Sequence, residues 1–190
     1  MRIRRLLAGL VVVCAIPVAA QETYVLDPVH SQPQYEARHI GFAIQHGNFG
    51  KMTGRVTLDR AAKTGTVDFT IDATSIKSND ARLDAILKGE RFFNVEKYPT
   101  LTFKSSSVTF DGDRVVAVDG ELTMVGVTKP ASFKVANFNC GENPFNKKAL
   151  CGADATATIK RSEWGMTNGL QINNPSDDIK LVVPVEAYKE

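Results

Sequence analysis

The sequence predicts an all-β protein, a closed antiparallel barrel of eight or more strands that carries one short helix. Three observations lead to this fold class. Apolar and polar side chains alternate with a period of two, turn residues separate the alternating segments, and the chain lacks the strand–helix–strand rhythm of a parallel sheet. A sandwich of two sheets is the less favoured alternative.

The chain begins with the three-part layout of a secretory signal. Three arginines within the first five residues precede an apolar run over residues 6–18, and two small residues follow it. A membrane anchor is the alternative, but the run falls short of the roughly 20 residues that a spanning helix needs. We therefore expect residues 1–20 to be removed and residues 21–190 to form a single domain in the periplasm or outside the cell.

The mature chain is nearly neutral. Loss of three arginines and no acidic residue from the 23 basic and 21 acidic side chains leaves a formal charge of −1. No basic run remains that could follow a phosphate backbone, so nucleic acid is not an expected partner.

Strand alternation is clearest in two segments. Val67, Phe69 and Ile71 share one face of a predicted strand, and Leu181 and Val183 share one face of another, with polar residues between them. Further strands are expected near residues 23–26, 31–39, 51–59, 100–110, 114–118, 120–125, 129–138 and 151–161.

Turn residues separate these strands. Glycine with aspartate or lysine predicts turns at residues 63–65, 111–113 and 119–120. Within 100–110 the apolar positions change from odd to even numbers across residues 105–107. That change of phase predicts a β-bulge.

One segment breaks the alternation and predicts a short amphipathic helix near residues 79–88. Leu83, Ile86 and Leu87 fall at helical spacing. Ser78 or Asn79 can cap its start, and Gly89 can end it.

The inner face of the barrel leaves open whether it is hollow or packed. Ala153, Ala155 and Ala157 alternate along one strand, and small inward side chains leave space. Aromatic residues from other strands could fill that space as an ordinary core, because an eight-stranded barrel can be either packed or hollow.

Two cysteines remain after removal of the signal, and we expect them to form a disulfide. Cys140 and Cys151 flank a segment rich in glycine, asparagine and proline, which is typical of a hairpin loop. A redox or metal role is the alternative, but the spacing is far from Cys-x-x-Cys and no histidine is nearby in sequence.

The three histidines lie within 17 residues of one another, and a metal site is one reading of them. No acidic or thiol partner completes a recognisable ligand spacing for His30, His39 and His46, so we expect no metal. Arg38 and His39 precede Ile40-Gly41-Phe42, where a cation and an imidazole could receive a polar head group. A surface ion pair is an equally good account of Arg38.

No sequence motif indicates catalysis. The chain has no Gly-x-Ser-x-Gly, no His-Glu-x-x-His and no phosphate-binding glycine loop. Asp177 and Asp178 follow Asn-Pro-Ser, which is typical of a solvated turn. We therefore expect a protein that is not an enzyme and has no cofactor.

Four long motifs resemble the YceI-like lipid- and polyisoprenoid-binding family over essentially the whole mature chain. They are LDPVHSQPQYEARHIGF, DARLDAILKGERFFNVEKYPTLTFKS, ELTMVGVTKP and ADATATIKRSEWGM, in that order. The resemblance implies an extended, lipocalin-like barrel of eight antiparallel strands with a long apolar tunnel. Pro33 departs from the family pattern and places its strand at an edge or a bulge.

The resemblance also implies where a lipid would bind. Head-group contacts are expected from His30, Arg38 and His39, and the helix with the Phe92-Phe93 turn resembles a flap over the tunnel. We expect the tunnel wall to include fourteen side chains: Tyr35, Phe42, Phe69, Ile71, Leu83, Ile86, Leu87, Phe92, Phe93, Leu101, Phe103, Met124, Phe133 and Trp164.

The function that the resemblance implies is sequestration or transport of an amphiphilic isoprenoid-type lipid, such as a polyprenyl phosphate or an isoprenoid quinone. Transient contact with a membrane or membrane protein, and a homodimer, are compatible with this role. One alternative is an enzyme that acts on such a lipid with His30 or His39 as acid or base. Another is a stress or antibiotic-sequestering protein that uses the same tunnel.

Overall fold

Strands account for most of residues 21–190, the part of the chain that the computed structural model describes. The predicted signal at residues 1–20 lies outside the described residues. The strands are β1 (Glu22–Leu26), β2 (Gln34–His39), β3 (Ala43–Phe49), β4 (Met52–Asp59), β5 (Thr64–Asp72), β6 (Ile76–Lys77), β7 (Thr100–Asp111), β8 (Arg114–Met124), β9 (Val127–Glu142), β10 (Ala149–Lys160) and β11 (Asp178–Lys189). The helices are α1 (Ala81–Lys88) and three short 3₁₀ turns, η1 (Ala73–Ser75), η2 (Arg161–Trp164) and η3 (Leu170–Ile172).

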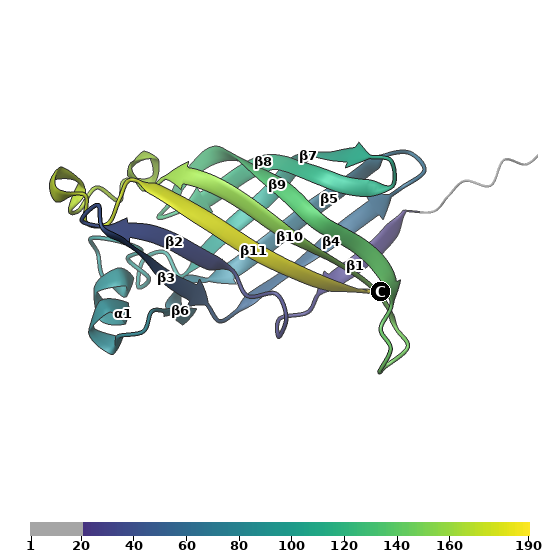
Figure 1. The fold of residues 1–190 in the computed structure, drawn as a ribbon, viewed down its shortest axis with the longest axis horizontal. Coiled ribbons are helices and arrows are strands. Elements are labelled where there is room, and N and C mark those ends of the chain that lie inside the picture. Colours follow the sequence, from purple (N-terminus) through teal and green to yellow (C-terminus); the bar gives the residue numbers. More distant parts are fainter. Residues whose placement is uncertain (1–20) are drawn as a thin grey trace, which may run out of the picture.

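Eight strands close into an antiparallel barrel, which confirms the predicted fold class (Figure 1). Their order around the barrel is β1-β4-β5-β7-β8-β9-β10-β11, and β1 returns to β11 through pairs such as Tyr24 with Lys189. Closure gives every strand of the ring two neighbours, so the ring has no free edge. None of the helices within residues 21–190 is long and apolar enough to span a membrane.

Strand β11 pairs with β10 along one edge and with two different strands along the other. Its C-terminal half pairs with β1, while its N-terminal half pairs with β2 through contacts such as Ile179 with Ala37. Strands β3 and β6 extend from β2 as a side branch of the sheet. This branch, α1 and the 161–177 connector lie at the left end of the barrel in Figure 1, opposite the C-terminus.

The branch differs from the prediction in two respects. Strand β2 begins at Gln34 rather than residue 31, directly after Pro33, whose carbonyl accepts a hydrogen bond from the Phe49 N–H at 2.8 Å. Proline therefore stands outside the ladder, where its missing N–H costs nothing. Strands β3 and β6 were not predicted, since β3 has weak alternation around Gly47 and β6 has only two residues.

Helix α1 forms where expected but begins later than predicted. Asp80, rather than Ser78 or Asn79, caps it: the carboxylate accepts from the Arg82 N–H at 2.7 Å. The Ser78 hydroxyl donates instead to the buried Asp84 carboxylate at 2.7 Å. Gly89 ends the helix, with its N–H on the Ile86 carbonyl at 3.1 Å.

Strand β8 is continuous, so the turn predicted at residues 119–120 is wrong. Gly120 pairs with Ser105 of β7 and with Ala131 of β9. A Cβ atom at position 120 would lie 2.6 Å from Cζ of Phe103, so glycine here lets an aromatic ring approach the backbone. The predicted bulge is confirmed by the register shift between Ser105 and Ser107.

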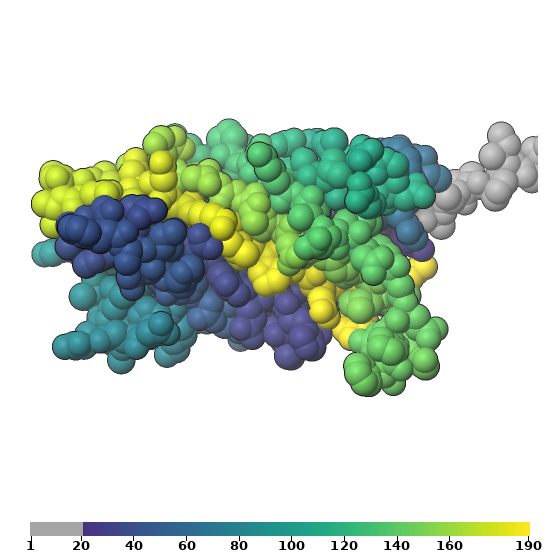
Figure 2. All heavy atoms as spheres, in the orientation of Figure 1, coloured from purple at the N-terminus to yellow at the C-terminus, as the bar shows by residue number. Residues whose placement is uncertain are grey.

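The disulfide between Cys140 and Cys151 joins β9 and β10, as predicted. The two cysteines lie directly opposite each other in the ladder. The hairpin tip that they support, coloured green, projects from the C-terminal end of the barrel in Figure 2.

Candidate functional site

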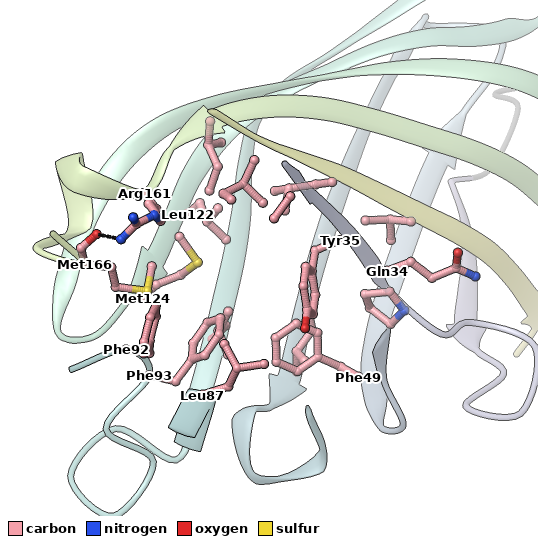
Figure 3. A pocket seen from close by; sticks show the side chains of 18 of the residues that line it. Gln34, Tyr35, Phe49, Leu87, Phe92, Phe93, Leu122, Met124, Arg161 and Met166 are labelled. Carbon is pink, nitrogen blue, oxygen red and sulfur yellow. Dashed lines mark hydrogen bonds between the residues drawn. The ribbon is translucent and has the colours of Figure 1, made fainter. Parts of the chain in front are cut away.

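An apolar cavity, which we call the mouth chamber, lies inside the barrel at the end that carries α1 (Figure 3). Its volume, counted as the space open to the centre of a water molecule, is about 90 Å³. One water needs roughly 10–15 Å³ on that scale, so the chamber has room for a string of several small groups. Its wall consists of Pro33, Gln34, Tyr35, Ala37, Phe49, Phe69, Ile71, Leu87, Phe92, Phe93, Leu101, Leu122, Met124, Phe133, Ile159, Arg161, Met166, Pro175, Ile179, Leu181 and Val183.

The mouth chamber brings together nine of the fourteen side chains predicted for a tunnel wall. Alternation along β5 and β7 turns these side chains inward, and the turn after α1 adds a pair of aromatic rings. The nine are Tyr35, Phe69, Ile71, Leu87, Phe92, Phe93, Leu101, Met124 and Phe133.

The structure places the other five predicted wall residues elsewhere. Phe103 and Trp164 are buried core residues that do not line this chamber, and the Trp164 indole N–H donates to the Leu122 carbonyl at 3.1 Å. Phe42 is 81% exposed in the β2–β3 turn. Leu83 and Ile86 of α1 are 39% and 56% exposed and line the open groove beside the chamber, whereas Leu87, one turn after Leu83, reaches the chamber itself.

An open groove, which we call the outer groove, adjoins the mouth chamber on its α1 side. Tyr35, Ala37, Leu87, Phe92 and Pro175 line both spaces. The rest of the groove mixes apolar and polar groups: His39, Gln45, Leu83, Ala85, Ile86, Gly89, Glu90, Arg91, Asn168 and Asn174. A ligand with an apolar chain in the chamber would have its polar end here.

Of the predicted head-group residues, only His39 lies in this groove. Tyr35, Ala37 and His39 alternate on the inward face of β2, so Arg38 points outward. The Arg38 guanidinium donates to the Phe42 carbonyl at 2.7 Å, and its backbone N–H donates to the Ser176 hydroxyl at 3.0 Å. The Arg38 side chain therefore points away from the outer groove and bonds to a backbone carbonyl.

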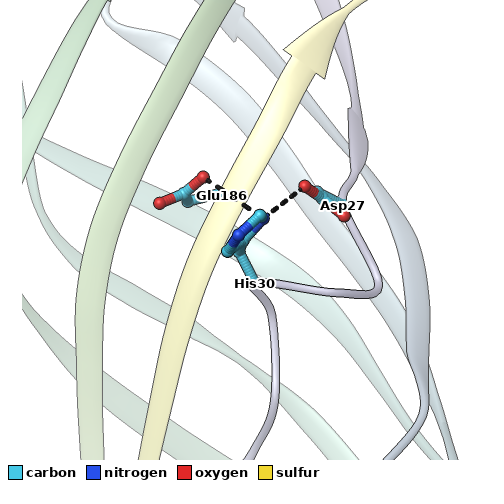
Figure 4. Close-up of side chains that lie close together, drawn as sticks. All are labelled: Asp27, His30 and Glu186. Carbon is cyan, nitrogen blue, oxygen red and sulfur yellow. Dashed lines mark hydrogen bonds and ion pairs between the residues drawn. The ribbon is translucent and has the colours of Figure 1, made fainter. Parts of the chain in front are cut away.

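His30 lies on the outer surface, beside β11 (Figure 4). Its Nδ1 is 2.7 Å from the Asp27 carboxylate and 3.9 Å from that of Glu186. The hydrogen bond with Asp27 raises the pKa of His30, and the same bond lowers the pKa of Asp27. The ligand atoms of the three residues lie within 4.8 Å of one another, a grouping that the sequence spacing did not reveal because Glu186 is remote in the chain. The short hydrogen bond accounts for the geometry without an ion.

Arg161 is a wall residue that the sequence analysis missed. It continues the inward face of Ala157 and Ile159 at the end of β10 and is only 2% exposed. Among the residues lining the mouth chamber, all within 21–190, it is the one charged group. The alternation of side chains along β10, continued by two residues beyond Ile159, was the sequence signal that could have identified Arg161 as a wall residue.

The guanidinium of Arg161 holds the 161–177 connector over the end of the barrel. It donates to the carbonyls of Ser176 at 3.0 Å and Pro175 at 2.7 Å, and also to that of Met166, the bond dashed in Figure 3. Burial lowers the pKa of this guanidinium. Its carbon lies 5.9 Å from the centre of the Phe92 ring, in cation–π range.

A second apolar cavity, the distal chamber, lies farther along the barrel interior. Its volume on the same scale is about 80 Å³. It is lined by Tyr24, Val56, Leu58, Val67, Val115, Val118, Val135, Phe138, Cys151, Gly152, Ala153, Ala155, Val185 and Ala187. The small residues of β10 that suggested a hollow interior, Ala153 and Ala155, line this chamber rather than the first.

A closed antiparallel barrel with an apolar interior and a groove at one end defines the class of small barrels that bind apolar ligands. Within that class, this chain belongs to the YceI-like family: the model of the YceI-like domain matches residues 24–187. Protein YceI of Salmonella arizonae is 30% identical over 185 residues, which cover 97% of this chain and 95% of that protein.

Solved structures share the fold. The YceI protein of Campylobacter jejuni matches with a TM-score of 0.68 and 27% identity, over 80% of this chain and 90% of that one. BcnA of Burkholderia cenocepacia matches with a TM-score of 0.71 and 23% identity, over 85% and 98%. A polyisoprenoid binding domain from Saccharophagus degradans matches with a TM-score of 0.63 and 14% identity, over 88% and 98%.

Proposed function

We propose that this protein binds an amphiphilic isoprenoid-type lipid, with the chain in the mouth chamber and the polar end in the outer groove. The observation that carries the proposal is the apolar mouth chamber inside a closed barrel. Membership of the YceI-like family supports a lipid-binding protein, and a relative in fold is named a polyisoprenoid binding domain.

The apolar chain contributes more to binding than the head group. A drug-sized ligand gains about 0.3 kcal/mol of binding free energy per heavy atom, so each five-carbon isoprene unit adds roughly 1.5 kcal/mol. A charge-assisted hydrogen bond to the head adds about 1.5–3 kcal/mol. A few buried isoprene units therefore contribute more binding free energy than the head group. The protein should select for an apolar chain more strongly than for a particular head group.

Tyr35 and His39 would receive the head group. Burial raises the pKa of Tyr35 to about 12, so its hydroxyl is a neutral donor at physiological pH. His39 follows on the same face of β2. Donors of this kind suit a quinone carbonyl or a phosphate oxygen.

The role that fits these features is carriage or sequestration in the periplasm or outside the cell, without catalysis or a cofactor. The signal-like N-terminus supports the compartment. Leu83 and Ile86, which are exposed in the wall of the outer groove, would favour transient contact with a membrane that donates or accepts the lipid. A homodimer is compatible with this arrangement. A stress or antibiotic-sequestering role would use the same chamber with another cargo.

Catalysis on the lipid is the alternative that a single substitution tests. His39 is the one predicted acid or base that lies in the outer groove. We expect the His39→Ala variant to retain lipid. Neither the wild-type protein nor this variant should form product from prenyl phosphates or quinones above background. Turnover by the wild-type protein that His39→Ala abolishes would favour an enzyme.

Mass spectrometry of lipid extracted from protein purified without detergent tests the binding proposal. We expect wild-type protein to carry an isoprenoid-type lipid. The substitution Leu181→Trp should fill the mouth chamber, so that the purified variant carries no lipid. Ile172→Trp, at an exposed position of η3, should still carry the lipid. Protein free of lipid in every preparation would contradict the proposal.

A further inference from the structure

The mouth and distal chambers are two parts of one barrel interior, lined in succession by the same strands. Along β11, Leu181 and Val183 line the mouth chamber, and Val185 and Ala187 line the distal chamber. Along β10, Ile159 belongs to the first and Ala155 to the second. On β11 the two sets of lining residues are successive inward positions, and on β10 only Ala157 lies between them, so the two spaces adjoin at one level of the barrel.

Three phenylalanine rings occupy that level, and we call them the phenylalanine partition: Phe69 of β5, Phe103 of β7 and Phe133 of β9. The rings of Phe69 and Phe103 stack at 5.1 Å between centroids, and the Phe133 ring meets Phe103 edge-on at 5.2 Å. All three are buried. Phe69 and Phe133 form part of the mouth-chamber wall, while Phe103 lines neither of the two chambers described within residues 21–190.

Small residues on neighbouring strands make room for these rings. Gly120 of β8 lies between Val118, which lines the distal chamber, and Leu122, which lines the mouth chamber. A Cβ atom there would collide with the tip of the Phe103 ring. Ala157 of β10 is buried at the same level, between Ile159 and Ala155. Aromatic rings and small neighbours thus pack together where the mouth chamber gives way to the distal chamber.

We propose that the phenylalanine partition is the floor of the lipid site and sets the length of chain that the protein holds. This inference rests on the proposed function. A chain that enters from the outer groove gains affinity with each unit that the mouth chamber buries, and stops at the Phe69 and Phe133 rings. The distal chamber is of similar volume and becomes available only when a ring is removed.

Affinity as a function of chain length tests this. The probes are linear prenols that lengthen by one isoprene unit, titrated against delipidated protein by intrinsic Trp164 fluorescence or calorimetry. In the wild type, Kd should fall roughly tenfold per added unit and then become constant once the chain reaches the partition. In Phe133→Ala the same tenfold steps should continue for at least one further unit before the plateau.

Phe138→Ala is the matched control, because Phe138 lines the distal chamber and is not part of the partition. The substitution removes the same ring atoms from the distal chamber and leaves the partition intact. The affinity of Phe138→Ala should therefore become constant at the same chain length as that of the wild type. If Phe133→Ala does not fold, Phe133→Leu removes the aromatic ring with less loss of volume and should move the plateau in the same direction.

The outcomes separate the two proposals. Wild-type affinity that rises with chain length, with a plateau that neither Phe133 variant moves, would overturn the partition and leave lipid binding intact. Wild-type affinity that is absent, or that does not change with chain length, would overturn the proposed function itself.

Discussion

The two ends of the barrel are held together by different forces. At the mouth end, the 161–177 connector is fixed by hydrogen bonds from a buried guanidinium to carbonyls, and α1 contributes one buried leucine. At the distal end, long ladders and a disulfide between facing strands hold β9 to β10. Hydrogen bonds that can break and reform reversibly hold the connector over the mouth chamber, whereas a covalent link reinforces the ladder at the distal end. This contrast suits a barrel that loads a ligand from one end.

The largest expected effect is at the mouth end. Arg161→Met removes the donors for three carbonyls, one buried (Met166) and two part-buried, and should lower the free energy of unfolding by about 3–5 kcal/mol. Urea unfolding followed by Trp164 fluorescence measures it. Arg38→Met, at an exposed arginine, is the control and should change the free energy by less than about 0.5 kcal/mol. Equal losses of unfolding free energy in the two variants would contradict the conclusion that Arg161 holds the connector at the mouth end.

Next in size is the covalent link at the distal end. The double substitution Cys140→Ala and Cys151→Ala should lower the free energy of unfolding by about 3 kcal/mol, the chain-entropy value for a loop of this length. Prenol affinity at the mouth chamber should not change, because neither cysteine lines it. Lost affinity in the folded double variant would mean that the two ends are coupled.

A smaller effect is expected at the level between the two chambers. Gly120→Ala brings a Cβ atom against the Lys104 carbonyl oxygen and within 2.6 Å of the Phe103 ring, and should cost about 1–3 kcal/mol in thermal or urea unfolding. Gly141→Ala, on β9, is the matched control, since a Cβ atom there meets nothing within 4 Å. The same stability for both variants would show that neither the Phe103 ring nor the Lys104 carbonyl requires a glycine at position 120.

The smallest effect is electrostatic and lies on the outer surface. Because the folded-state pKa of His30 is raised, its pair with Asp27 stabilises the fold below the ordinary histidine pKa, and this is lost as pH rises through the raised value. The lowered pKa of Asp27 means that its contribution is lost as pH falls through that lowered value. Asp27→Asn should return the His30 pKa toward its ordinary value in an NMR titration, and Glu186→Gln should lower it less. An unchanged His30 pKa in Asp27→Asn would exclude the hydrogen bond.

Prediction from the sequence was most successful where the signal is local. The alternation of Val67, Phe69 and Ile71 identified β5 and its inward face, and the phase change near Ser106 identified a bulge. The same local reasoning was wrong at Asp119-Gly120, because the pair is typical of a turn. Pairing with β7 and β9 on both sides overrides that tendency and keeps the strand continuous.

The candidate site was predicted in part for a related reason. The family resemblance implied fourteen wall residues, and nine of them line the mouth chamber, six on strands where alternation turns them inward. Parity does not state the level along the barrel at which a side chain lies. Phe69 and Phe103 are both inward and directly paired, yet only Phe69 lines a chamber. Arg161 was missed because its three carbonyl partners lie in a connector without periodicity.

The sequence by itself determined the antiparallel β architecture, the helix before Gly89, the facing cysteines and the family, since each depends on residues close together in the chain or on long motifs. Only the tertiary structure decided that β11 pairs with both β1 and β2, that two apolar chambers lie along the interior, and that Phe69, Phe103 and Phe133 pack together where the chambers adjoin. Those features depend on the register and tilt of strands that are remote in sequence, and register is set by the closure of the whole ring.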